Sequence, residues 1–147
     1  MEFFLSAQGR IPRYQWWLGS IGLAVAGIIV GAIIGVAFGP AARAFGGRFV
    51  LFLVSLAIIY ASYCLIAKRF HDRDKPELYA QLVVGFRLVK VVLDLLGVSG
   101  NYLQLNAIDY VFLSVLVGIG VWLFIDLGCL RGTLGENQYG PDPLAGR

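Results

Sequence analysis

The chain has a single histidine, His71, and Asp72 follows it directly. A carboxylate beside an imidazole is a pair used in general acid–base chemistry. Adjacent residues, however, rarely turn their side chains toward one another, and no serine or cysteine stands in a recognisable nucleophile context. One histidine is also too few for a hydrolase-type metal centre or a bis-histidine haem. We therefore interpret the pair as structural or interfacial, with a pH-sensitive contact or catalysis as the alternatives. We predict that the protein is not an enzyme and uses no cofactor or metal.

A second set of ionisable residues lies in the apolar segment 78–98. Arg87, Lys90 and Asp94 have the spacing i, i+3, i+7 and so share one face of a helix. Each charge at a membrane centre costs about 2.5–3.5 kcal/mol on an insertion scale. The helix either lies on the membrane surface or spans the membrane with this stripe turned inward and paired. We slightly favour the span, because Lys90 can pair with Asp94, and Asp126 is another candidate partner.

Basic residues gather beside the apolar segments. We interpret them, together with the His–Asp pair, as contacts for a cytoplasmic partner or for lipid headgroups. A basic side chain near an anionic membrane surface contributes about 1 kcal/mol. Anionic lipids at the cytoplasmic face are therefore expected partners of the following residues: Arg10, Arg13, Lys68, Arg69, His71, Asp72, Arg73 and Lys75.

Composition indicates which kind of fold must position these residues. The 147 residues are 59% hydrophobic and only 14% charged, with a mean hydropathy of +0.77. Soluble domains average roughly 45–50% apolar and about 25% charged residues. These values exclude a disordered chain and argue against a large soluble enzyme. They predict a single integral membrane domain over 1–147. The net charge of +3 comes from short clusters beside apolar runs, so we predict no nucleic-acid partner.

Three segments are long and apolar enough to cross a bilayer, for which about 20 residues suffice. The predicted fold is an all-α bundle of four helices, with three transmembrane spans and one charged amphipathic span or interfacial helix. Cys64 and Cys129 fall in apolar runs and are interpreted as buried. The predicted boundaries are a cytoplasmic or interfacial segment at 1–16, spans at 17–38, 49–67 and 110–130, the charged helix at 78–98, and a polar tail at 131–147.

Glycines recur every fourth residue in the first span. Small residues at this spacing let a second helix approach closely in a membrane. We favour packing within this chain, and self-association through the same glycine zipper is the alternative. The stripe consists of Gly27, Gly31, Gly35 and Gly39.

The distribution of lysine and arginine predicts the orientation of this multi-pass protein. Cytoplasmic loops carry an excess of these residues, which places the N-terminus and the loop 68–77 in the cytoplasm. The tail is cytoplasmic as well if 78–98 spans the membrane, and outside if 78–98 lies on its surface. No cleavable signal peptide is recognisable.

Three short motifs stand out together: GRIPRYQWW at 9–17, KRFHD at 68–72 and GENQYGPDP at 135–143. They resemble the domain-of-unknown-function 805 family of small bacterial inner-membrane proteins. The resemblance implies several spans in a bacterial inner membrane and no known reaction. It falls on Gly9, Arg10, Arg13 and Trp17 (or Trp16, one place early), on Lys68, Arg69, His71 and Asp72, and on Gly135, Asn137, Tyr139, Gly140 and Pro141.

Two departures from the family pattern concern the charged helix. The family usually continues its His–Asp with a Ser-Gly-Trp-Trp type of entry, which is missing here, and the stretch from Asp72 to Gly135 is longer than usual. The helix at 78–98 is therefore interpreted as peculiar to this member.

We predict a non-enzymatic accessory or scaffold subunit of a membrane complex that binds other membrane-protein subunits or itself. The alternative is a small transporter or channel-like protein that uses the stripe of Arg87, Lys90 and Asp94. We further hypothesise that the tail folds back, so that Glu136, Asn137 or Asp142 binds the basic cluster.

Overall fold

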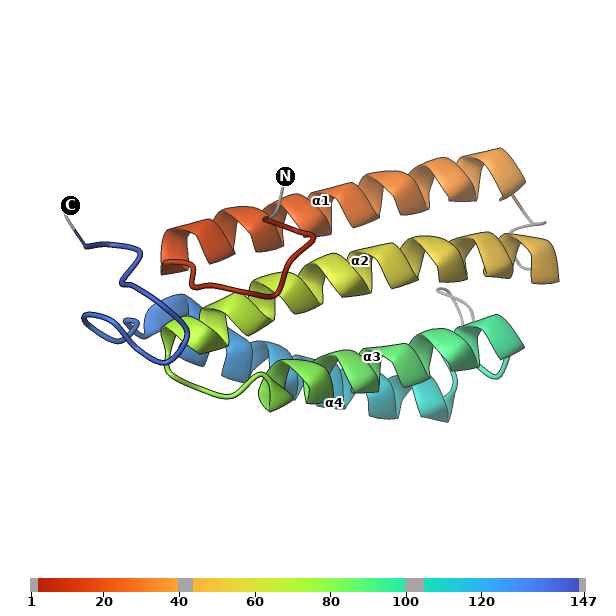
Figure 1. The fold of residues 1–147 in the computed structure, drawn as a ribbon. Coiled ribbons are helices and arrows are strands. Elements are labelled where there is room, and N and C mark those ends of the chain that lie inside the picture. Colours follow the sequence, from red (N-terminus) through yellow and green to blue (C-terminus); the bar gives the residue numbers. More distant parts are fainter. Residues whose placement is uncertain (1–2, 40–43, 100–104, 146–147) are drawn as a thin grey trace.

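The computed structural model describes residues 3–39, 44–99 and 105–145, which form a bundle of helices (Figure 1). A six-residue π-helix continues the last α-helix without a break. The predicted all-α architecture with four helices is confirmed, and the described residues form no strand. The elements are α1 (Arg13–Phe38), α2 (Phe45–Asp72), α3 (Leu78–Leu96), α4 (Ala107–Leu123) and η2 (Phe124–Cys129).

Three helices are long and apolar enough to cross a membrane, and they cover the three predicted spans except for Leu130, which follows the last helix. They are α1, α2 and the continuous helix Ala107–Cys129. The 26 residues of α1 extend about 39 Å at 1.5 Å per residue. Many large apolar side chains point outward, among them Val36 with 87% exposure. Such a surface suits lipid rather than water, which agrees with the predicted membrane protein.

Local signals explain where two of the helices begin. α1 starts directly after Pro12, whose fixed φ suits the entry to a helix. α4 starts with a capping box, in which the side chains of Asn106 and Asp109 each accept a hydrogen bond from the other's backbone N–H. These signals place the starts of the two helices three or four residues before the predicted apolar runs.

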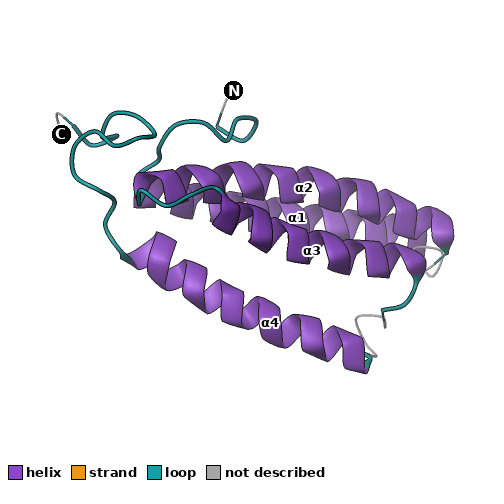
Figure 2. Ribbon diagram, turned by 60° about the horizontal axis from the view of Figure 1, so that its bottom comes forward, coloured by secondary structure: helices purple, strands orange, loops and turns teal. Residues whose placement is uncertain are grey.

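The charged segment 78–98 forms α3, which runs antiparallel to α2 and lies beside it in both views (Figures 1 and 2). It ends at Gly97, which adopts a left-handed conformation with φ +72°. After α3, α4 runs back in the opposite direction (Figure 1). The tail therefore emerges at the end of the bundle where α1 begins and α2 ends.

Most of the buried core lies at this same end of the bundle. It contains Trp16 from α1, Phe70 from α2 and Leu127 from η2. Aromatic rings attach α4 to the other helices, with ring centroids of Phe70 and Trp122 5.5 Å apart and those of Phe86 and Phe112 4.8 Å apart. We call this the motif end, because all three sequence motifs lie there, and we call the opposite end of the bundle the far end.

The glycine stripe of α1 does not pack in the way predicted. Gly27 faces Ile58 at ordinary van der Waals distance, whereas Gly31 and Gly35 have open space where a Cβ would lie. The close approach of α1 to α2 occurs instead at Gly19, against Leu65. The prediction that the stripe packs within this chain is therefore wrong beyond Gly27 for the described residues, and self-association through the stripe stays a prediction.

The two cysteines lie in different environments. Cys64 is buried as predicted, whereas Cys129 is exposed. The prediction for Cys129 was wrong because the residue closes the π-helical turn at the surface of the bundle instead of lying on an inner helix face.

Candidate functional site

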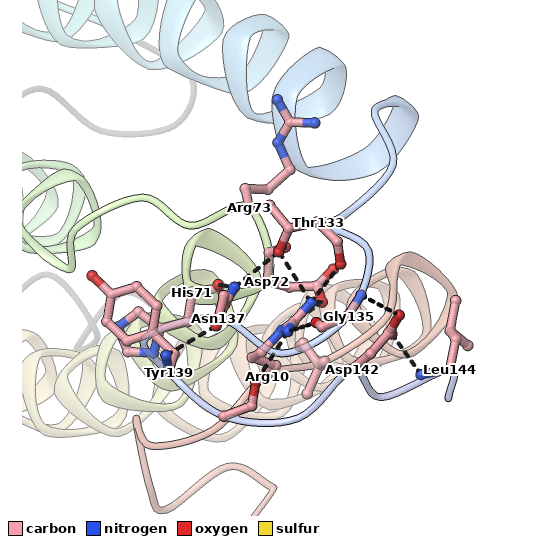
Figure 3. A network of polar contacts seen from close by, with 12 residues as sticks. Arg10, His71, Asp72, Arg73, Thr133, Gly135, Asn137, Tyr139, Asp142 and Leu144 are labelled. Atoms are coloured by element: carbon pink, nitrogen blue, oxygen red, sulfur yellow. Dashed lines mark hydrogen bonds and ion pairs between the residues drawn. The ribbon is translucent and has the colours of Figure 1, made fainter. Parts of the chain in front are cut away.

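Arg10 joins the segment before α1 to both α2 and the tail (Figure 3). Its side chain is only 1% exposed. Its Nε donates to Asp72 Oδ1 at 3.2 Å, and its Nη1 donates to the carbonyl oxygens of Gly135 at 2.7 Å and Gly140 at 3.1 Å. Its Nη2 donates to the carbonyl oxygen of Thr133 at 2.7 Å. One buried guanidinium thus links segments more than 60 residues apart through charge-assisted hydrogen bonds.

Asp72, the last residue of α2, is the counter-charge of this cluster. Its buried carboxylate forms ion pairs with Arg10 and Arg69. Its carbonyl oxygen accepts from Thr133, from the backbone N–H at 2.8 Å and from the hydroxyl at 3.1 Å. Gly132 lies so close that a Cβ at this position would overlap the Asp72 carboxylate. The tail therefore fits against α2 only with glycine at position 132.

Arg69 holds the end of the π-helix. Its side chain is 1% exposed, its Nε donates to the carbonyl oxygen of Leu127 at 2.8 Å, and its Nη2 donates to that of Leu130 at 2.7 Å. The last carbonyls of a helix have no partner within the helix and carry partial negative charge. The buried Arg69 guanidinium gives these carbonyls hydrogen-bond donors and places a positive charge beside their partial negative charge.

His71 contacts the tail through its ring and its backbone. The ring stacks on Tyr139 with centroids 4.0 Å apart and planes at 7°. Its Nδ1 lies 3.3 Å from the carbonyl oxygen of Gly9, and its Nε2 is buried without a hydrogen-bond partner among the described residues. The Asp72 carboxylate contacts arginines instead of this ring, so the two side chains do not act as a catalytic pair in this arrangement.

Asn137 binds the tail to the end of α2. Its side-chain N–H donates to the carbonyl oxygen of His71 and to Thr133 Oγ1, each at 2.9 Å. Asp142 instead accepts backbone hydrogen bonds from Leu144 at 2.9 Å and from Gly135 at 3.2 Å. The hydrogen bond from the Leu144 N–H lowers the pKa of the Asp142 carboxyl most, and the bond from the Gly135 N–H has the next largest effect. We call Arg10, Arg69, His71, Asp72, Thr133 and Asn137, with the carbonyls they contact, the motif cluster.

Asp126 lies at the motif end and not beside the charged stripe. It forms ion pairs with Arg73, at 3.1 Å, and with Lys75. The proposal that Asp126 pairs with the stripe was wrong, because α4 returns toward the motif end and carries Asp126 to the loop after α2. Lys68 is likewise engaged and donates to the carbonyl oxygen of Phe3 at 3.1 Å.

The charged stripe of α3 lies toward the far end. Lys90 pairs with Asp94 on the same helix and with Asp109 of α4 at 3.2 Å. Arg87 is half-buried, and the structure gives its side chain no hydrogen bond or ion pair with another described residue. The prediction of an inward-facing stripe therefore fits Lys90, whereas the functional role of the stripe stays a prediction.

Several residues of these clusters were missed in the sequence. Asp109 had a readable signal, because Asn106 three residues earlier completes a capping box. Gly132 and Thr133 had none, since their roles depend on where the tail lies against α2.

The fold and the motif cluster define a class: a helical membrane protein whose two terminal segments are bound to the end of its second helix. The chain belongs to the family described as "Protein of unknown function (DUF805)", whose model matches residues 4–141. The "Uncharacterized protein YiiR" of Escherichia coli K12 and that of Escherichia coli O157:H7 are each 29% identical to it over 144 residues. That alignment covers 96% of this chain and 88% of each relative. No solved structure matches the chain.

Proposed function

We propose that this protein is a non-enzymatic accessory or scaffold subunit of a membrane complex and acts by binding. One observation carries the proposal, namely that the polar groups of all three motifs bind one another. Arg10 and Asp72 are buried and ion-paired, and Asn137 joins them through Thr133. Side chains engaged in this way hold the chain together and are not aimed at a substrate.

The consequence is a surface of fixed shape at the motif end. Loops that are already ordered lose less conformational entropy when a partner binds them. The tail presents exposed groups on this surface, including Glu136 and Leu134, whose exposure is 71%. Leu134 and the exposed polar groups beside it offer a partner both apolar and polar contacts. A neighbouring subunit of the same membrane fits this combination.

The charge distribution supports a cytoplasmic position for this surface in a bacterial inner membrane. Basic residues concentrate in the segment before α1 and in the loop after α2, as expected for cytoplasmic ends. The tail is bound to the first through Arg10 and to the second through Arg73, so it belongs on the same side. In this proposal α3 crosses the membrane with the other three helices.

Site-specific photo-crosslinking in intact cells tests the proposal. A photoreactive amino acid replaces Glu136 on the tail, and the matched control carries it at Val117, an outward residue of α4 with 57% exposure. We expect a discrete protein adduct from position 136 that disappears when Arg10→Ala releases the tail. No adduct at 136, or the same adduct in the Arg10→Ala variant, would contradict a binding role for the closed motif end.

A small transporter or channel-like protein is the second candidate. Arg87 favours it, because this half-buried cation on an apolar helix has no partner among the described residues, and ionisable groups inside a membrane bundle often mark a polar pathway. Ala substitutions of Arg87, Lys90 and Asp94 separate the two functions. A transporter loses flux while the adduct at 136 persists, and a scaffold protein keeps both its adduct and the host's fluxes.

A further inference from the structure

A cavity of about 260 Å³ lies at the motif end, between the start of α1, the end of α2 and the tail. A water molecule occupies roughly 30 Å³, and sites for drug-sized ligands begin at about 300 Å³. The cavity therefore has room for one small charged group with a few waters. Its lining includes Arg13, Arg69, Arg131, Asp72, Asp142 and Leu144.

Two of the three arginines in this lining are free to bind a ligand. Arg13 and Arg131 are exposed, and the structure gives neither side chain a hydrogen bond or ion pair with another described residue. Arg13 also lies close enough to Arg69 for their positive charges to repel. An anion placed between these guanidiniums relieves that repulsion.

The two carboxylates of the lining offset only part of the charge of its three arginines. The Asp142 carboxylate lies close enough to Arg131 for their opposite charges to attract. Asp72 is bound by Arg10 and Arg69. Asp142 accepts the backbone N–H groups of Gly135 and Leu144. The first turn of α1 also contains no acidic residue, and its N-cap residue, Pro12, forms no side-chain capping bond. Its partial positive charge adds to that of the arginines.

We propose that this cavity binds a phosphate group through Arg13 and Arg131. The planar fork of a guanidinium matches two phosphate oxygens at once, which makes arginine the preferred residue for this ligand. The phosphate is either the headgroup of an anionic phospholipid or a soluble phosphate. Leu134 and Leu144 in the same lining favour the lipid, since they give its glycerol and first methylenes an apolar contact. The inference does not depend on the proposed scaffold role.

Lipid titration of the purified full-length protein in mild detergent tests the site, with native mass spectrometry as the readout. The probe is phosphatidylglycerol, and the matched control is a diacylglycerol with the same acyl chains and no phosphate. We expect wild type to retain phosphatidylglycerol in preference to diacylglycerol. The double variant Arg13→Ala/Arg131→Ala should bind phosphatidylglycerol about tenfold more weakly, which corresponds to roughly 1.4 kcal/mol.

The double variant Arg13→Lys/Arg131→Lys keeps the charge but loses the fork, and it should recover only part of the affinity. Thermal unfolding of both variants should match wild type, because neither side chain forms a bond within the described chain. A parallel titration with inorganic phosphate identifies the source: displacement of the lipid at equal concentration indicates a soluble phosphate, and persistence indicates the headgroup. Equal retention of phosphatidylglycerol by wild type and the double alanine variant would overturn the proposal.

Discussion

The two ends of the bundle both contain ion pairs, but they differ in what surrounds the charges. At the motif end, Arg10 and Asp72 are 62 residues apart, and their side chains are 1% and 5% exposed. At the far end, Lys90 and Asp94 are four residues apart on one helix, with exposures of 21% and 47%. The first pair joins distant parts of the chain, whereas the second connects neighbouring turns of a single helix.

The difference teaches that burial, and not the presence of opposite charges, decides what an ion pair contributes. Removing one partner of a buried pair leaves an uncompensated charge and is strongly destabilising. An exposed pair at i, i+4 has water as an alternative partner and contributes a few tenths of a kcal/mol. The motif end therefore determines where the tail lies, whereas the Lys90–Asp94 pair does not.

The largest effect is expected for Asp72→Ala, which leaves Arg10 and Arg69 without their counter-charge. We expect a loss of about 3–5 kcal/mol in the free energy of unfolding. The matched variant Asp94→Ala removes the same group at the far end and should cost at most about 1 kcal/mol. Thermal unfolding in detergent compares the two, and equal losses would refute the contrast between the ends.

Gly132→Ala tests the packing of the tail without changing any charge. The new methyl group overlaps the Asp72 carboxylate, and overpacking of this kind costs about 1–3 kcal/mol. Gly31→Ala is the control, since a Cβ there meets open space. Both are measured by thermal unfolding. A loss of stability or a change of oligomeric state in Gly31→Ala would indicate that the glycine stripe contacts a second copy.

Asn137→Ala removes the two side-chain hydrogen bonds that bind the tail to His71 and Thr133. A net loss of about 1 kcal/mol should raise the population of the detached tail about fivefold. The rate of tryptic cleavage after Arg131 reports that population. Gln138→Ala, which removes an exposed bond to Asp74, should leave the rate close to that of wild type. Equal acceleration by both variants would mean that Asn137 does not hold the tail.

The smallest effect is a pH dependence of the tail. Backbone N–H groups of Leu144 and Gly135 lower the pKa of the Asp142 carboxyl below its ordinary value. A depressed pKa means that these bonds stabilise the tail above the unfolded pKa of about 4 and are lost as the pH falls through the folded pKa. Amide hydrogen exchange over 133–144, corrected for intrinsic rates, should show this loss. Asp142→Asn should flatten it, and an unchanged profile in that variant would assign the effect to another group.

The helices and the residues of the motifs could be predicted from the sequence, but their partners could not. Apolar runs of span length specify helices locally, and Trp17, Arg69 and Asn137 stood out by type and spacing. The partner of Asp126 was assigned wrongly because the assignment assumed proximity to Lys90 and Arg87. The ion pairs of Asp126 depend on the return direction of α4, which no local signal specifies.

By itself, the sequence determined a four-helix membrane bundle and the candidate residues at its ends, because hydropathy and helical periodicity act over short stretches of chain. Only the tertiary structure decided that Arg10, Asp72 and Asn137 belong to one cluster, and that Arg13 and Arg131 line one cavity. The physical reason is that a buried polar group must find a partner wherever the fold brings one close. Which partner that is depends on the packing of the whole chain.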